Sequence, residues 1–238
     1  MMRRLTISLI LAVFAITSIS AQDLDKILND HFKASAQEKM SKVTTVTING
    51  KIVSMGMEMG MTIYQSRPGK LRIEADFAGS KMIQTYDGTT GWVYAPAMGI
   101  AEPQQMDSNQ LKAILTQAEM DSPLWNAKEK GSKIELLGAS EDGSANMVKL
   151  TTAEGDEMTI YISKETSLIS KIMMVMMVSG MENEIETEMK DYKTVKGIPT
   201  AHYMASKMDG QLVSTITFES IEYNKALESS LFVKPVVE

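Results

Sequence analysis

The stretch that decides the fold is residues 55–77, which read MGMEMGMTIYQSRPGKLRIEADF. From Met55 to Ile63 every second residue is apolar, and small or polar residues fill the positions between them. The same alternation returns over 71–77, after the turn signal Arg-Pro-Gly-Lys at 67–70. Because successive side chains of a strand point to opposite faces, this pattern predicts two antiparallel strands with one apolar and one polar face.

Most of the remaining chain keeps this period of two, and turn dipeptides divide it into segments. Such dipeptides accept the positive φ of tight hairpin turns, and they are Asn49-Gly50, Asp87-Gly88, Asp142-Gly143 and Asp209-Gly210. We expect strands near 42–48, 51–66, 70–78, 81–86, 91–95, 133–138, 145–152, 157–163, 168–178, 181–193, 199–208 and 211–223. The prediction is a mainly β (α+β) fold with a large antiparallel sheet of about 11–12 strands.

Two segments show helical spacing instead. Apolar residues between Leu24 and Phe32 predict an amphipathic helix over about 23–40. A second helix follows the capping sequence that begins at Asp107. We expect the segment 96–125 to cover one face or one mouth of the sheet as a lid. Its inward side chains would be Leu111, Ile114 and Leu115.

The composition excludes several classes of protein. The chain has 238 residues, no Cys, two His and a formal net charge of -6. The absence of Cys excludes disulfides, thiolate metal sites, cysteine nucleophiles and a lipid anchor on an N-terminal cysteine. The acidic balance argues against nucleic acid as a partner.

Residues 1–21 have the features of a cleavable secretory signal. Arg3 and Arg4 are followed by an apolar run over 5–16 and by small residues at 18–21. The apolar run is short for a membrane span, although an uncleaved anchor is the alternative. We therefore expect a signal peptide at 1–21 and one exported, soluble domain over 22–238.

Methionine is in excess, with 21 residues, and many of them lie on single strand faces. Such a face can be an ordinary core, or a cavity whose unbranched side chains adapt to a lipid or a hydrophobic peptide. A third possibility is Cu(I), which thioethers bind well. The stretch 172–178 is apolar at every position, so we expect it to be covered on both faces. The candidate cavity residues are Met55, Met57, Met59, Met61, Ile63, Leu71, Ile73, Phe77, Met158, Ile160, Met174 and Met176.

The sequence contains no motif that indicates catalysis. It has no nucleophile elbow, no zinc-protease helix and no phosphate-binding loop. Trp92 and Tyr94 can either pack in a core or edge the mouth of a pocket. We therefore expect no enzymatic activity, no cofactor and no bound metal.

Three local strings occur in an order that is typical of one family. They are Arg67-Pro68-Gly69-Lys70-Leu71-Arg72-Ile73-Glu74; then Tyr86-Asp87-Gly88 with Gly91-Trp92-Val93-Tyr94; and Asn224-Lys225-Ala226-Leu227 with Phe232. In this order and spacing, over most of residues 23–235, the chain resembles the outer-membrane lipoprotein-sorting (LolA-like) family of periplasmic carriers.

The resemblance implies an unclosed antiparallel half-barrel with a helical lid over a hydrophobic cavity. It implies a periplasmic monomer that takes the acyl chains of lipoproteins, or other lipids, from an inner-membrane lipoprotein-releasing transporter to an outer-membrane acceptor. By position, Arg67 and Pro68 would lie at the cavity rim, and Trp92 and Tyr94 on the strand that enters the lid loop. The same fold also serves lipid-sensing envelope-stress proteins, and a Met-rich copper-binding module is the alternative from another class.

Overall fold

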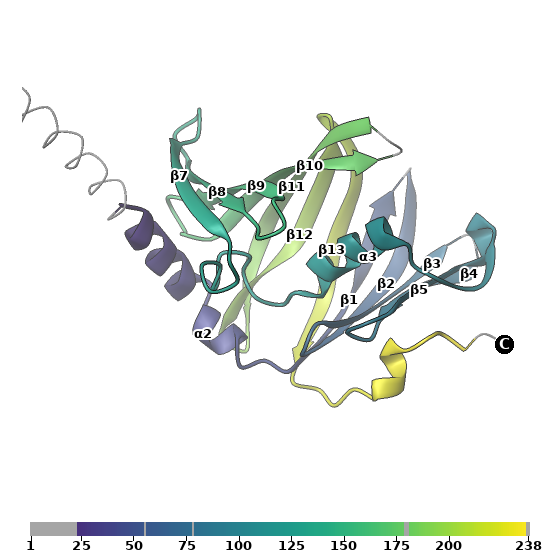
Figure 1. Cartoon of the computed structure of the whole chain (residues 1–238). Coiled ribbons are helices and arrows are strands. Elements are labelled where there is room, and N and C mark those ends of the chain that lie inside the picture. Colours follow the sequence, from purple (N-terminus) through teal and green to yellow (C-terminus); the bar gives the residue numbers. More distant parts are fainter. Residues whose placement is uncertain (1–22, 55, 78, 179–180, 237–238) are drawn as a thin grey trace, which may run out of the picture. The chain divides into compact units, whose positions relative to one another are not determined.

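The computed structural model describes residues 23–54, 56–77, 79–178 and 181–236. Thirteen strands form one antiparallel sheet in the order β6-β5-β4-β3-β2-β1-β13-β12-β11-β10-β9-β8-β7 (Figure 1). Its two end strands, β6 and β7, do not pair with each other within the described ranges, so the sheet is not closed. The predicted class, a mainly-β unclosed half-barrel with few helices, is confirmed. The predicted signal peptide at 1–21 and the candidate residue Met55 lie outside the described residues.

Outside 42–66 and 100–105, the strands follow the predicted segments closely. Their bounds are β1 Thr45–Ser54, β2 Met57–Ser66, β3 Lys70–Phe77, β4 Ser80–Tyr86, β5 Gly91–Ala95, β6 Ile100–Gln105, β7 Lys133–Ala139, β8 Ala145–Thr151, β9 Glu157–Ser163, β10 Ile169–Val178, β11 Met181–Val195, β12 Ile198–Met208 and β13 Gln211–Tyr223. The helical segments are residues 23–34, α2 Gln37–Met40, η1 Pro96–Met98, α3 Ser108–Ala118 and η2 Ser229–Phe232. None of the helices in the described ranges is long and apolar enough to cross a membrane.

Contacts along the chain define two compact units. One comprises Met1–Ser35 with Leu124–Glu184, and the other comprises Ala36–Pro123 with Ile185–Glu238. The expectation of a single domain over 22–238 stays a prediction.

In the second unit, one predicted hairpin turn is wrong. Asn49-Gly50 lies inside β1, which continues to Ser54, and Gly56 is in the turn that precedes β2. The pairing of β1 with β13 shifts at Asn49/Gly50, which marks a bulge. A Cβ on Gly50 would lie 2.3 Å from the backbone oxygen of Thr217. This glycine is thus required for the close approach of two strands and not for a positive φ.

A second correction concerns residues 100–105, which lie in the predicted lid segment 96–125 and outside the predicted strands. They form β6, which pairs only with β5 and ends the sheet. Proline is tolerated there because an edge strand has one row of backbone N–H groups without a ladder partner.

The helix expected over 23–40 is interrupted. Residues 23–34 are helical, and α2 begins only at Gln37. Ala36 adopts a left-handed φ of 51° between the two pieces, and the Ser35 hydroxyl donates to the carbonyl of His31. A left-handed residue cannot continue a right-handed helix, so the chain changes direction at this point.

The C-terminal segment lies against the polar face of β3 to β5. The side chain of Phe232 is 2% exposed. Arg72 donates to the carbonyl of Leu231 at 3.0 Å, and Thr85 donates to the carbonyl of Val233 at 3.1 Å. Together with Asn224, whose Oδ1 accepts from the backbone N–H of Thr44, these contacts give the C-terminal motif a structural role.

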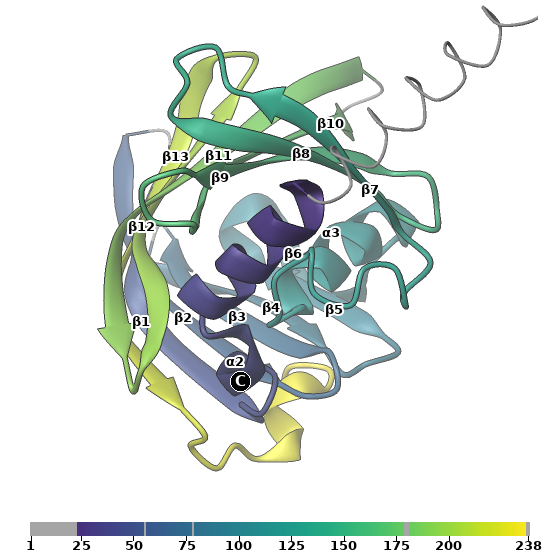
Figure 2. The same ribbon diagram turned by 90° about the vertical axis from the view of Figure 1, so that its left-hand side faces the viewer.

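The first unit contains the N-terminal helix and β7 to β10. The helix lies beside β8 and β9 (Figure 2), and its buried His31 contacts the carbonyl of Ser167 at 2.9 Å. Phe32 of the same helix meets Trp125 edge to face, with 5.0 Å between the ring centroids. Hydrophobic and aromatic side chains thus fix this helix on its unit.

The expectation that 172–178 is covered on both faces is wrong. Val175 and Met177 are each 63% exposed, and Met176 is 37% exposed. These residues lie near the end of β10, where it runs toward the hairpin with β11. Pairing with β9 covers 169–174 only, so the last residues of the strand project beyond that partner.

Candidate functional site

The strongest candidate site is a transverse row of apolar side chains across five strands of the second unit. Strand register places the members of this apolar row opposite one another on one face of the sheet. They are Met59 on β2, Ile52 on β1, Ile216 on β13, Met204 on β12 and Met189 on β11. Each side chain is only partly buried. The face therefore keeps apolar surface that the described structure does not cover.

Burial on this face increases along β2 from one end to the other. Met57, next to the hairpin turn, is 42% exposed, Met59 is partly buried and Met61 is 8% exposed. Beyond Met61, Ile63 and its partner Ile73 pack against the core under α3. The predicted residues Met57, Met59, Met61, Ile63, Leu71, Ile73 and Phe77 share this face of β2 and β3. The face is thus closed at the α3 end and open at the hairpin end.

The helix α3 covers the closed end, as the lid prediction requires. Asp107 caps it by accepting from the backbone N–H groups of Asn109 and Gln110, both at 2.9 Å. Ile114 is 2% exposed and packs with Leu71. Leu111 joins this core, but Leu115 is 45% exposed and does not point inward as expected. Ala118 takes the inward position because the spacing 111, 114, 118 follows the helix repeat.

Trp92 and Tyr94 do not lie on the apolar face. They alternate on β5 with Val93, which packs in the core under α3. The Lys234 ammonium lies 4.9 Å from the centroid of the Trp92 ring. Period-two alternation therefore places both aromatic side chains on the opposite face, beside the C-terminal segment.

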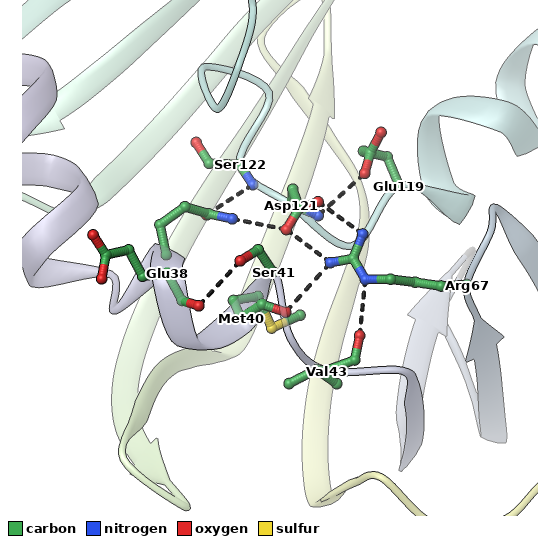
Figure 3. Close-up of polar contacts among 9 residues, drawn as sticks. Glu38, Met40, Ser41, Val43, Arg67, Glu119, Asp121 and Ser122 are labelled. Carbon is green, nitrogen blue, oxygen red and sulfur yellow. Dashed lines mark hydrogen bonds and ion pairs between the residues drawn. The ribbon is translucent and has the colours of Figure 1, made fainter.

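Arg67 joins three segments at the closed end of the face (Figure 3). Its guanidinium donates to both carboxylate oxygens of Asp121 at 2.8 Å, and to the backbone carbonyls of Val43 at 2.8 Å and Met40 at 3.3 Å. Gln37 donates to Asp121 at 2.8 Å and accepts from the N–H of Ser122. This network fixes the segment that follows α3 to α2 and to the turn between β2 and β3.

A hollow of about 290 Å³ adjoins this network. Pro68 and Leu115 contribute to its wall, together with charged groups of Arg67 and Glu119. The volume is at the low end for small-molecule pockets, which run from ~300 to 1,000 Å³. The rim position implied for Arg67 and Pro68 thus corresponds to a small, partly polar hollow below the lid, apart from the apolar row.

In the first unit, the remaining predicted residues also share one strand face. Met158 is opposite Met174, and Ile160 is opposite Ile172. Ile160 is fully buried, with Val148 of β8 on its other side. Met176 lies farther along the same face of β10 and is 37% exposed. These residues therefore form a core at Ile160 that becomes more exposed toward Met176.

Charged side chains of β11 and β12 lie on the face opposite the apolar row. Lys207 donates to Glu186 at 2.9 Å and to Glu188 at 2.7 Å. Hydrogen bonds from Lys190 and then Lys207 lower the pKa of Glu188 to about 2. Burial raises the pKa of Tyr192 to about 12, and its hydroxyl donates to the sulfur of Met189 at 3.8 Å. The charges of Lys207, Glu186 and Glu188 thus lie away from the apolar row.

Within the described residues, strand pairing places no second methionine opposite Met59 or Met61 of β2. The β1 residues opposite Met59 and Met61 are Ile52 and Gly50, and the β3 residue opposite Met61 is Ala75. Along one strand, same-face neighbours are ~6.8 Å apart. The adjacent strands therefore bring no further thioether to the described part of this ladder. Nor do the described residues contain a group of three or more His, Asp or Glu side chains placed to hold a metal ion.

Comparison with known proteins gives a consistent picture of the fold. No family model and no curated protein matches the chain. Among solved structures, a LolA superfamily protein from Nitrosomonas europaea matches with a TM-score of 0.56 and 10% identity, over 83% of this chain and 96% of its own. The fold is LolA-like.

Two further structures share the LolA-like fold. A DUF1329 family protein from Desulfovibrio piger has a TM-score of 0.57 at 14% identity, and the alignment covers 87% of this chain and 97% of that one. An outer-membrane lipoprotein-sorting protein domain from Vibrio parahaemolyticus has a TM-score of 0.54 at 12% identity, with 83% and 94% coverage. At these identities the likeness concerns the fold alone.

Sequence reasoning missed four of the five residues of the apolar row in this LolA-like fold. Ile52, Met189, Met204 and Ile216 belong to the row, and only Met59 on β2 was predicted. One signal was present, since Ile185, Thr187 and Met189 alternate with glutamates on β11. The cross-strand partners of Met189 depend on register, which the alternation of one strand does not specify.

Proposed function

We propose that this chain is a soluble periplasmic carrier that binds the acyl chains of lipoproteins, or of other lipids, on the apolar face of the second unit. The observation that carries the proposal is the apolar row, which crosses five strands and remains partly exposed. Methionine and isoleucine side chains of mixed shape suit flexible hydrocarbon chains, because thioethers repack at little cost. The LolA-like fold supports the same class of ligand.

Burial of hydrocarbon supplies the affinity in this proposal. Each CH₂ group removed from water contributes about 0.8 kcal/mol, so two or three acyl chains bind strongly. Release then requires a partner or a movement of α3, because such a ligand dissociates slowly by itself. An inner-membrane lipoprotein-releasing transporter and an outer-membrane acceptor would supply the two ends of the route. The proposal includes no catalytic step and no cofactor.

The network around Arg67 gives the lid a fixed end. It anchors residues 119–122, directly after α3, while the helix itself contacts β3 and β4 through apolar side chains. When the lid opens, α3 would replace its apolar contacts with β3 and β4 by contacts with lipid. The hydrogen bonds between Arg67 and Asp121 would stay in place. The 96–125 segment is accordingly the proposed lid.

A pair of adjacent substitutions on β13 tests the proposal. Ile216→Glu places a charge in the apolar row, whereas Thr217→Glu places it on the opposite face, where Thr217 is exposed and pairs with Lys51. Delipidated protein should bind a fluorescent fatty-acyl probe, and Ile216→Glu should weaken binding at least tenfold while Thr217→Glu leaves it unchanged. Absence of binding by the unsubstituted protein, or equal effects of both substitutions, would contradict the proposal.

A further inference from the structure

A row of hydroxyl side chains lies beside the apolar row on the same face. On each of four strands, the hydroxyl residue lies two positions from the residue of the apolar row, on the side of the hairpin turns. The members of this hydroxyl row are Ser54 on β1, Ser214 on β13, Ser206 on β12 and Thr187 on β11. Strand register places them opposite one another in that order, and Met57 of β2 is opposite Ser54. The change from apolar to hydroxyl side chains thus occurs at one level across four strands.

Three of these hydroxyls have unused hydrogen-bonding capacity. Ser54 donates to the backbone carbonyl of Val213 at 3.1 Å. Within the part of the chain that the structure describes, the side chains of Ser206, Ser214 and Thr187 form no hydrogen bond, although each is partly buried. A hydroxyl group can donate one hydrogen bond, and in a half-buried position it needs a partner from water or from a ligand.

The surroundings of the hydroxyl row favour an uncharged partner. The ionic groups at this level, Lys207, Glu186 and Glu188, lie on the opposite face and bind one another. A phosphate or a free carboxylate would therefore find hydroxyl donors but, among the described residues of β1, β2 and β11 to β13, no cation on the face of the hydroxyl row. An ester or amide carbonyl needs only a donor, which each serine supplies.

The distance from the hydroxyl row to the lid is somewhat greater than the length of an acyl chain. Six residues separate Met57 from Ile63, which packs against the core under α3. At ~3.3 Å per residue this is about 20 Å. One leaflet of a bilayer core, half of ~30 Å, is about 15 Å thick. A chain of this length whose linkage lies at the hydroxyl row would thus end near Met61, at the edge of the core under α3.

We propose that Ser206, Ser214 and Thr187 bind the ester or amide carbonyls of an acylated ligand, whose chains then lie over the apolar row and point toward α3. This inference rests on the proposed function and adds to it the chemical class and the orientation of the ligand. It places the polar end of the cargo at the open, hairpin end of the face. The carrier would accordingly prefer acyl-linked lipids to alkyl ethers of equal chain length.

The test compares two probes on three proteins. The probes are a diacylglycerol and its dialkyl ether analogue with the same chain length, titrated against delipidated full-length protein. The unsubstituted protein should bind the ester about tenfold more tightly than the ether. The double variant Ser206→Ala/Ser214→Ala should lose this preference and keep its affinity for the ether. Ser220→Ala, on the opposite face of β13, removes a hydroxyl from the same strand and should keep the preference.

The outcomes separate the two proposals. Equal binding of ester and ether by the unsubstituted protein, or a preference that survives in the double variant, would overturn the role of the hydroxyl row and leave the carrier function standing. Failure of both probes to bind any of the three proteins would overturn the carrier function itself. Thermal unfolding of each variant shows whether a lost preference comes from lost folding.

Discussion

Both carboxylate oxygens of Asp121 accept hydrogen bonds from the guanidinium of Arg67, Nη1 to Oδ2 and Nη2 to Oδ1, each at 2.8 Å. The side chain of Asp121 is 10% exposed and that of Arg67 is 27% exposed. This bidentate ion pair ties the turn between β2 and β3 to the segment that follows the lid helix. The ion pair therefore links the sheet to the end of α3, the helix that the proposed function requires to move.

Removal of this ion pair should loosen the end of the lid. Arg67→Leu leaves the Asp121 carboxylate half-satisfied in a mostly buried position, and we expect a loss of roughly 2–3 kcal/mol in the free energy of unfolding. Amide hydrogen exchange should increase first over 108–123. The matched control is Lys26→Ala, which breaks an exposed pair with Asp30 and should change stability by less than about 0.5 kcal/mol. Equal effects of the two variants would contradict the anchoring role.

The two strand glycines of the β1–β2 hairpin should respond differently to alanine. At Gly50 a Cβ would be 2.3 Å from the oxygen of Thr217, whereas at Gly60 its nearest neighbour is the Asp76 carboxylate at 3.9 Å. We expect Gly50→Ala to cost about 2 kcal/mol or more through overpacking, and Gly60→Ala to be neutral or slightly stabilising. Urea unfolding of both variants measures the difference. A neutral Gly50→Ala would contradict the close strand contact at the bulge.

The stability of the chain should depend on His31 near neutral pH. Burial lowers the pKa of this imidazole from its ordinary value of 6.5. As pH falls below about 6.5, His31 of the unfolded chain binds a proton while His31 of the folded chain stays neutral. The contribution of His31 to the free energy of unfolding is therefore complete above about pH 6.5 and is lost as pH falls toward the folded pKa. The melting temperature should fall between pH 7.5 and 5.5. In His31→Gln the slope over this range should be smaller, and an unchanged slope would contradict the assignment.

Copper should bind weakly to the methionine ladder of β2. Because Ile52, Gly50 and Ala75 are the cross-strand neighbours of its described members, no compact set of three thioethers forms there. Anaerobic titration with Cu(I) against a competing chelator should show no tight, stoichiometric site. Tight binding that disappears when Met55, Met57, Met59 and Met61 are replaced by leucine would instead support the copper-binding module.

Much of this architecture could be predicted from sequence, because strand period and turn chemistry are local. The capped lid helix after Asp107 and the hairpins at Asp87-Gly88, Asp142-Gly143 and Asp209-Gly210 occur as expected. Asn49-Gly50 did not form its predicted turn, since a bulge against β13 needs the same residue type. Ala36 and β6 were missed because a single left-handed alanine and an edge strand with proline have no clear local signal.

The candidate site was harder to predict than the fold. The alternation of β2 indicates which of its side chains share a face, but not which residues of β1, β13, β12 and β11 lie beside them. Those neighbours are set by the register of strand pairing. In β13 a bulge near Phe218 interrupts the alternation of side chains, so that Ile216 and Ile221 lie on the same face although five residues separate them. The hydroxyl row depends on the same registers and has no signature in any one strand.

Native mass spectrometry of the protein isolated from its own envelope tests the central claim most directly. The account predicts that a fraction of the protein carries added mass of one or more acyl-linked lipids or a lipoprotein, and that Ile216→Glu reduces this fraction whereas Thr217→Glu does not. Protein that is free of lipid when isolated, and that takes up no acyl probe after delipidation, would contradict it.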